Sequence, residues 1–342
     1  MCVFYHVYMK RRKYRGLMTA SVTLIGIITI MFGCHTAPKY SFAEGVVWNT
    51  LYHITYSGPS ALSDSIKPLL DNVGKSVSIF NSESLVNKLN TSDSCKTDAI
   101  LRKIYNISLK VNRESNGMFD PTLSPLITAW GFGKGHHATT DTLRLDSLLA
   151  FTGIRRTYLR NGFICKPDPR MQFNFSAVAK GYGCDAIGEW LISKGVKNYL
   201  VEIGGEIACK GKNPKGGNWV ISIDKPIADP KGKLHISQMK ISLTDCGIAT
   251  SGDYRNYHKS GVTRYGHTIH PKTGRPVQTD ILSATVIAAN AMEADAYATA
   301  CVAMGSGEAI KMVERLNLNV MLILDDSSVW ESKSFIKQIK VK

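Results

Sequence analysis

The chain has 342 residues, of which 44% are hydrophobic and 20% are charged. These proportions are typical of a folded globular protein and exclude a disordered tail, a collagen or a coiled coil. Lysine and arginine number 42 against 27 aspartates and glutamates, which gives a formal net charge of +15. A basic body suits a phosphate-bearing ligand or an anionic surface, but the charge balance does not indicate the fold.

A basic and apolar leader opens the chain. The segment KRRKYR at 10–15 precedes an uncharged run, Gly16 to Gly33, and Cys34 follows. This order is the layout of a secretory signal, and the Gly-Cys pair at its end is similar to a bacterial lipobox. We expect a lipoprotein-type signal peptide over 1–33, a lipid on Cys34 and a short tether over 34–44. An uncleaved membrane helix and plain secretion are the alternatives.

All three interpretations of the leader place the body outside the cytoplasm. A lipid on Cys34 would make the protein a membrane-anchored lipoprotein of the bacterial cell envelope that faces the periplasm. No later stretch of the chain is comparably apolar, so the sequence does not predict a protein with several membrane spans.

The predicted elements of the first half begin with a strand. Residues 46–56 are rich in β-branched and aromatic side chains, which favour a strand. Apolar residues at helical spacing predict helices over 61–80 and 97–115, the second of which ends at an Asn-Gly pair. The Gly- and Pro-rich stretch 117–135 predicts a structured loop with a short helix, and a further helix is expected over 177–194.

The second half mixes strands and helices without a regular alternation. Strands are expected over 198–203, 219–226, 240–252, 281–289 and 319–326, and helices over 292–304 and 306–316. The segment 240–252 is expected to continue the sheet and to end in a turn of small residues. The absence of a βαβ rhythm favours an α+β fold, with mixed sheets and packed helices, over a doubly wound sheet.

Six cysteines lie beyond the leader. They are Cys95, Cys165, Cys184, Cys209, Cys246 and Cys301. They form no CxxC pair, so the sequence does not favour a zinc cluster. Three disulfides could form in an oxidising space, but a body of this size does not need them. We expect mostly buried thiols.

Small residues surround Lys180 in the segment FNFSAVAKGYGCDAI, residues 173–187. At a predicted helix start, small side chains let backbone amides approach an anion. The helix dipole and the Lys180 ammonium group would both favour phosphate there. The alternative is a tightly packed helix with a solvated lysine.

A carboxylate and a hydroxyl recur at helical spacing in AMEADAYATA, residues 291–300. Asp295 and Thr299 are four positions apart, so they share one face of a helix. Together they could hold a hard cation such as Mg²⁺, which prefers oxygen ligands. The alternative is a capped helix start, with Glu293 or Asp295 near the positive end of the dipole.

Histidine and aromatic residues mark two further segments. In 247–277, Thr250-Ser251-Gly252 offers hydroxyls, and His267 could act as a base near neutral pH or be a hydrogen-bonded structural residue. In the 117–135 loop, Phe119, Trp130 and Phe132 could line a flat aromatic ligand or belong to the core.

Taken together, these segments resemble the FAD:protein FMN transferase family, also called the ApbE or thiamine biosynthesis lipoprotein family. The likeness runs from about Gly45 to Asp325. Its marks, in chain order, are WNTLYHITY, FDPTLSPL with AWGFG, NFSAVAKGYGCD, VEIGGEI, WVISIDKP, IATSGDYRNY, GHTIHPKTGRP and EADAYATA. Each mark is weak alone, but independent chance matches would have to recur in the same order.

The resemblance implies one catalytic body over 45–342 that transfers FMN from FAD to a threonine hydroxyl of a target protein and releases AMP. Mg²⁺ is the implied metal, and FAD is the substrate. The implied partners are exported flavoproteins, such as subunits of redox-driven ion pumps, and no nucleic acid. An FAD pyrophosphatase, which yields FMN and AMP, and a lipoprotein that only binds flavin are the alternatives.

The resemblance also implies residue roles. The metal ligands would be the backbone oxygen of Ala177 and the side chains of Asp295 and Thr299. His267 stands at the position of the family's candidate base, and His267 and Asp295 are the implied catalytic residues. The implied FAD-binding residues are Trp48, Ser78, Trp130, Gly131, Phe132, Asn174, Lys180 and Ile269.

Overall fold

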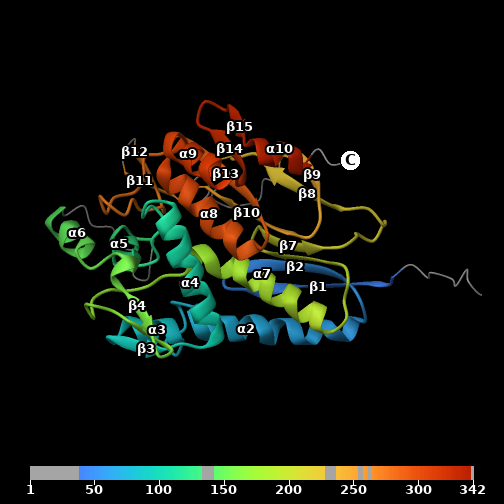
Figure 1. The fold of residues 1–342 in the computed structure, drawn as a ribbon, viewed down its shortest axis with the longest axis horizontal. Helices are drawn as coiled ribbons and strands as arrows, with labels where there is room; N and C mark the ends of the chain where they lie inside the picture. Colours follow the sequence, from blue (N-terminus) through green and yellow to red (C-terminus); the bar gives the residue numbers. More distant parts are fainter. Residues whose placement is uncertain (1–37, 133–141, 228–235, 253–256, 261–262, 340–342) are drawn as a thin grey trace, which may run out of the picture. The chain divides into compact units, whose positions relative to one another are not determined.

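A computed structural model describes residues 38–132, 142–227, 236–252, 257–260 and 263–339 (Figure 1). Residues Tyr40–Lys342 form one compact unit. The expected signal peptide and Cys34 lie outside the described residues, so the leader and its boundaries stay predictions. Among the residues that the structure describes, no helix is both long and apolar enough to cross a bilayer.

The core of the unit is an eight-stranded sheet in which every neighbouring pair is antiparallel. Its strands, in spatial order, are β1 (Tyr40–Val47), β2 (Thr50–Ser57), β6 (Tyr199–Ile203), β7 (Glu206–Lys210), β10 (Cys246–Ser251), β13 (Ile281–Ala288), β14 (Asn319–Leu324) and β15 (Val329–Glu331). The sheet and its packed helices confirm the predicted α+β class.

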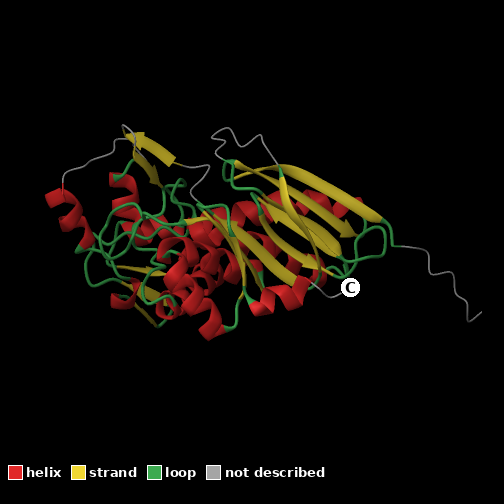
Figure 2. Ribbon diagram, turned by 90° about the horizontal axis from the view of Figure 1, so that it is seen from above, coloured by secondary structure: helices red, strands yellow, loops and turns green. Residues whose placement is uncertain are grey.

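Helices cover one face of this sheet (Figure 2). Helix α7 (Ser176–Ser193) packs on β6 and β7, and α8 (Ala291–Met304) packs on β10 and β13. The outer helices are η1 (Ser60–Ser65), α2 (Ile66–Val77), α3 (Leu85–Asn90), α4 (Ala99–Glu114), α5 (Ser124–Ala129), α6 (Thr142–Leu149), η2 (Ile154–Arg156) and α9 (Ser306–Leu316).

A hairpin covers the other face. Strands β8 (Trp219–Asp224) and β9 (Ser237–Leu243) form a separate sheet, and α10 (Lys333–Ile339) packs beside them. Their apolar side chains share a core with those of β7, β10, β13 and β14. Two further small sheets pair β3 (Ser94–Lys96) and β4 (Tyr158–Arg160) with β5 (Phe163–Cys165), and β11 (Tyr257–Ser260) with β12 (Thr263–Gly266).

Two expected strands are each interrupted by a turn. The strand expected over 46–56 is part of the β1–β2 hairpin, because Trp48 and Asn49 turn the chain with φ of 49° and 61°. The segment 240–252 is divided at Asp245, whose φ is 54°, so β9 and β10 belong to different sheets. Both turns use left-handed backbone at residues other than glycine, which periodicity does not reveal.

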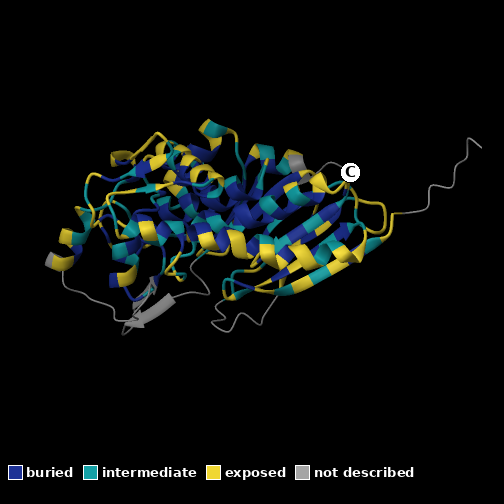
Figure 3. Ribbon diagram, turned by 90° about the horizontal axis from the view of Figure 1, so that it is seen from below, coloured by how far each residue is buried: buried dark blue, intermediate teal, exposed yellow. Residues whose placement is uncertain are grey.

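The helices expected over 97–115, 177–194, 292–304 and 306–316 are confirmed as α4, α7, α8 and α9, each within two residues at either end. The helix expected over 61–80 begins as the 3₁₀ turn η1 and ends at Val77. Helix α8 is the most enclosed of the group (Figure 3), with buried alanines along most of its length.

Close backbone contact places the start of α8. The side chain of Asp185 in α7 accepts hydrogen bonds from the backbone N–H groups of Ala291 at 2.8 Å and Met292 at 2.9 Å. Burial raises the pKa of Asp185 to about 6. Gly247 in β10 lies so close that a Cβ atom there would be 2.0 Å from the backbone nitrogen of Ala291. The first turn of α8 is thus held from two sides.

A methyl group at Gly247 tests this packing. We expect Gly247→Ala to lower the free energy of unfolding by about 3 kcal/mol, because the new Cβ would overlap rigid backbone. Gly307→Ala is the control, since a Cβ at this exposed helical position meets open space; it should add roughly 0.5–1 kcal/mol. Urea denaturation measures both, and a Gly247→Ala protein as stable as the parent would contradict the packing.

Candidate functional site

A cavity of about 480 Å³ lies where α7, α8, β7 and β10 meet the loops around α5 and after β12. It brings together predicted site residues from distant parts of the chain. Those that line it are Phe132, Asn174, Ala177, Lys180, His267, Ile269, Asp295 and Thr299. The candidate site therefore forms from the segments in which sequence analysis had placed chemistry.

Four predicted FAD-binding residues do not line the cavity. The indole of Trp48 packs against Gly74 of α2 and Gly183 of α7. Trp130 is buried and donates its indole N–H to the Gly274 carbonyl oxygen at 2.8 Å. Ser78 and Gly131 are chain neighbours of the lining residues Ile79 and Phe132, respectively. Their roles in FAD binding stay predictions.

A buried charge centre lies at the polar end of the cavity. The Nζ atom of Lys180 is 2.5 Å from Oε1 of Glu206, and the backbone N–H of Gly181 donates to Oδ2 of Asp295 at 3.1 Å. The Glu206 and Asp295 residues are only 2% and 4% exposed. One ammonium group therefore faces two carboxyl groups that have almost no contact with water.

Burial and mutual charge shift all three groups. Burial raises the pKa of Glu206 to about 8; the charge of Asp295 acts in the same direction, and Lys180 opposes both. Burial likewise raises the pKa of Asp295. For Lys180, burial favours the neutral amine, but the two carboxylates outweigh it and raise the pKa above its usual value. The two carboxyl groups therefore stabilise the Lys180 ammonium group, while burial raises the pKa of each acid.

The charge centre suits an additional cation. Oε2 of Glu206 is buried and has no hydrogen-bond partner among the residues that the structure describes. Ala177 and Thr299 line the same cavity as Asp295, so a backbone carbonyl, a hydroxyl and a carboxylate are available together. Hard cations such as Mg²⁺ prefer this set of oxygen donors. Among the described residues, no cluster of three His, Cys, Asp or Glu side chains could hold a metal. The predicted ligands Ala177, Asp295 and Thr299 are not such a cluster, because only Asp295 is one of these residue types.

Glu206 lies in the motif VEIGGEI, but no pattern of residues in the sequence predicts it as a site residue. Gly204 and Gly205 form the turn between β6 and β7 with φ of 61° and 103°, and Glu206 is the first residue of β7. In this strand Glu206 and Ala208 are both buried. An acid at a buried position of a strand, directly after a glycine turn, is the signal that could have found it.

Apolar side chains form another part of the cavity lining. Ile79, Phe80, Met118, Phe119, Leu123, Ile127 and Phe132 line it. The rings of Phe132 and His267 meet edge to face, with centroids 6.3 Å apart. Phe119 is both buried and a lining residue, so the two interpretations of this aromatic residue are compatible.

Asp120 is a second carboxyl group that the sequence analysis did not select. It lines the cavity, but its oxygens accept hydrogen bonds from the backbone and hydroxyl of Thr122 and from the Ile154 backbone. Burial raises the pKa of Asp120, and these hydrogen bonds oppose that effect. The donors around Asp120 tie α5 to the η2 turn, so this residue supports the wall of the cavity.

A cavity lined by both charged and apolar side chains can hold a molecule that carries phosphates and a flat ring. Lys180 offers a charged donor for phosphate, and Asn174 offers an amide. The aromatic and aliphatic wall offers a surface for a planar ring system. His267 lies in the same cavity as the charge centre.

Comparisons with known proteins agree with this arrangement. The model of the ApbE family matches residues 48–323. A Vibrio cholerae protein named FAD:protein FMN transferase is 32% identical over 324 residues, which cover 90% of this chain and 95% of the relative. A Haemophilus influenzae protein of the same name is 29% identical over 341 residues, which cover 94% and 98%.

Comparison with solved structures gives the same family. The structure of the flavin transferase ApbE from Vibrio cholerae superposes with a TM-score of 0.79 at 32% identity, covering 88% of this chain and 99% of that one. The family match spans most of the body, and the structural match includes the large antiparallel sheet with its helices. The chain therefore belongs to the ApbE family and is an enzyme of the transferase class.

Proposed function

We propose that this protein transfers the FMN moiety of FAD to a threonine hydroxyl of exported flavoproteins and releases AMP, in a reaction that depends on Mg²⁺. The observation that carries the proposal is the meeting of Lys180, His267 and Asp295 in one cavity with an apolar end. The names of the relatives support transfer of FMN from FAD.

The chemistry of FAD matches the two ends of the cavity. The isoalloxazine ring is flat and largely apolar, so we place it against the wall that contains Phe119 and Phe132. The diphosphate is anionic, so we place it toward Lys180 and Asn174. This orientation brings the diphosphate close to the buried charge centre and leaves His267 beside the reacting phosphorus.

The transfer is a displacement at phosphorus. The threonine oxygen attacks the phosphorus of the FMN half, a new P–O bond forms, and the bond to the AMP oxygen breaks. A threonine hydroxyl is a poor nucleophile until a base accepts its proton. His267 is our candidate for that base. Lys180 would stabilise the charge on the phosphate oxygens, so positioning and electrostatics supply most of the acceleration.

Mg²⁺ fits the polar end of the cavity. Ala177, Asp295 and Thr299 would hold it through a carbonyl, a carboxylate and a hydroxyl oxygen. When bound there, the ion would supply Lewis-acid stabilisation of the diphosphate charge. The second carboxyl group, Glu206, keeps one oxygen without a partner and so adds to the affinity of this end for a cation.

We also propose that the enzyme is a lipoprotein of the cell envelope, anchored through Cys34. The basic and apolar leader supports this proposal. A periplasmic location would restrict the clients to exported flavoproteins, such as subunits of redox-driven ion pumps.

Incubation with FAD, Mg²⁺ and a candidate acceptor protein tests the proposed function. Mass spectrometry of the acceptor should find FMN bound to one threonine, and an acceptor with that threonine replaced by alanine should stay unmodified. Release of free FMN and AMP without modification of any acceptor tested would contradict transfer and would identify a pyrophosphatase instead.

The metal assignment predicts the behaviour of an Asp295 variant. Asp295→Asn removes the charged oxygen donor, so we expect Mg²⁺ affinity to fall by at least about 100-fold and metal-dependent turnover to disappear. Calorimetric titration with Mg²⁺ measures the affinity. Asp71→Asn on the exposed face of α2 is the matched control and should bind Mg²⁺ as the parent does. Unchanged affinity in Asp295→Asn would remove Asp295 from the metal site.

The base assignment predicts a difference between two nearby histidines. His267 lines the cavity, whereas His270 lies three positions later and is not one of the lining residues. We expect His267→Gln to lower kcat by on the order of 10²–10⁴, with FAD still bound, because the hydroxyl loses its proton acceptor. His270→Gln should retain nearly full turnover. Equal rates for parent and His267→Gln would exclude His267 as the base.

A further inference from the structure

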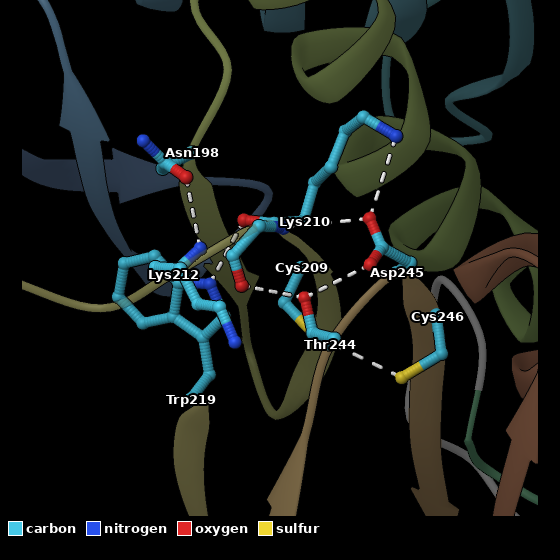
Figure 4. Close-up of polar contacts among 9 residues, drawn as sticks. Asn198, Cys209, Lys210, Lys212, Trp219, Thr244, Asp245 and Cys246 are labelled. Carbon is cyan, nitrogen blue, oxygen red and sulfur yellow. Dashed lines mark hydrogen bonds and ion pairs between the residues drawn. The ribbon is translucent and has the colours of Figure 1, made fainter. Parts of the chain in front are cut away.

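Two cysteines face each other across neighbouring strands and belong to the core that the β8–β9 hairpin shares with the sheet. Cys209 in β7 is paired directly with Cys246 in β10, and their sulfurs are 3.8 Å apart (Figure 4). Both residues are buried, with exposed fractions of 3% and 7%. Both are thiols in the structure. Among the six cysteines that the structure describes, this is the pair whose side chains are in hydrogen-bond contact.

The backbone of the pair meets the geometric requirement for a disulfide. Directly opposed residues in antiparallel strands have Cα atoms about 4.5–5.5 Å apart. Disulfides span Cα separations of about 4.4–6.8 Å, so the strands need not move. Rotation of the side chains about χ1 would bring the two sulfurs from contact to bonding distance.

Hydrogen bonds beside the two cysteines fix the ends of strands β7 and β10 relative to each other (Figure 4). Thr244, just before Cys246, donates its hydroxyl to the carbonyl oxygen of Gly211, just after β7, at 2.6 Å. The backbone N–H of Gly211 donates to Oδ1 of Asp245 at 3.4 Å. The indole of Trp219 donates to the carbonyl oxygen of Lys210 at 2.9 Å. The two strand ends that carry the thiols are therefore already fixed to each other.

The two thiols have unequal acidity. The sulfurs of Cys209 and Cys246 share a hydrogen bond, and this contact lowers the pKa of Cys209 although burial and Asp245 oppose it. The pKa of Cys246 is raised by the same contact and by burial. The charged groups beside the pair are Lys210 and Asp245, which form an ion pair at 3.4 Å.

We propose that Cys209 and Cys246 form an intramolecular disulfide by exchange with a small-molecule or protein disulfide. The thiolate of one cysteine attacks one sulfur of the oxidant, and the oxidant's other sulfur leaves as a thiol. The second cysteine then attacks the protein sulfur of the mixed disulfide, and the remaining thiol of the oxidant is released. Two thiols lose two electrons and two protons, and the oxidant's disulfide is reduced to two thiols.

The cross-link would close a large loop and stabilise the part of the sheet that carries the cavity. The cysteines are 37 positions apart, and the chain between them contains the β8–β9 hairpin. Glu206 precedes Cys209 in β7, and Thr250 follows Cys246 in β10; both line the cavity. A bond between the strands therefore fixes their register without occupying the cavity. Closing a long loop stabilises a protein mainly by restricting its unfolded state.

The other four described cysteines are not placed opposite a second cysteine in a strand pair. Cys184 donates its thiol to the backbone oxygen of Glu206, and Cys301 is buried in α8. Cys95 is paired with Ile164 across β3 and β5, whereas Cys165 is paired with Ser94. Because successive side chains alternate between faces of a sheet, Cys95 and Cys165 point to opposite faces.

Oxidation of the purified full-length chain with oxidised glutathione tests the proposal. After blocking of residual thiols and proteolysis, mass spectrometry should find one cross-linked pair of peptides that contains Cys209 and Cys246. The oxidised protein should melt about 5–10 °C higher than the protein kept in a dithiol reductant. Blocked, uncross-linked Cys209 and Cys246 in the folded, oxidant-treated protein would overturn the proposal.

Two single variants separate this bond from other effects of oxidation. Cys246→Ser cannot form the cross-link, so its melting temperature should not depend on the oxidant. Cys165→Ser changes a partly exposed thiol on a different sheet and should keep the full shift. If Cys246→Ser fails to fold, the peptide map of the parent protein decides alone. A melting shift that persists in folded Cys246→Ser, or that is absent from the parent, would contradict the proposal.

Discussion

Two carboxyl groups, those of Glu206 and Asp295, are buried beside one ammonium group, that of Lys180. Burying an acid is unfavourable unless a charge or hydrogen bond compensates it. Lys180 and the Gly181 N–H supply part of the compensation, and one oxygen of Glu206 receives none. The polar end of the cavity is therefore arranged to attract positive charge, and the chemistry we propose depends on this imbalance.

The surrounding fold keeps these groups together. Lys180 comes from α7, Glu206 from β7 and Asp295 from α8, so the centre forms only if two helices and the sheet approach closely. Gly181 and Gly247 allow that approach, because the backbone at the start of α8 lies where their Cβ atoms would be. Asp185 then ties the first turn of α8 to α7. A site built on packed elements of this kind holds its groups more precisely than a site on loops.

The sequence was sufficient to predict the helices with strong periodicity and to identify most of the segments that form the cavity. Helices α4 and α9 have one apolar face, which periodicity detects. Helices α7 and α8 are small-residue helices whose functional side chains were selected through motif resemblance. The class of fold followed from the irregular alternation of strands and helices.

The failures have physical causes in particular residues. Trp48 and Asp245 adopt left-handed backbone, which is uncommon for such residues, so two turns were read as continuous strand. Trp48 and Trp130 pack in hydrophobic clusters and do not line the cavity, and their roles in FAD binding stay predictions. A large aromatic residue can serve in a core or in a binding site, and sequence does not separate the two. Glu206 was overlooked because its importance arises from a salt bridge to a residue in another element.

A crystal structure of the protein with FAD and Mn²⁺ in place of Mg²⁺ tests the central claim most directly. The anomalous signal of Mn²⁺ should lie within bonding distance of Asp295 and Thr299, with the diphosphate of FAD between the ion and Lys180. An ion bound away from Asp295, or FAD bound outside the cavity between α7 and α8, would contradict the account.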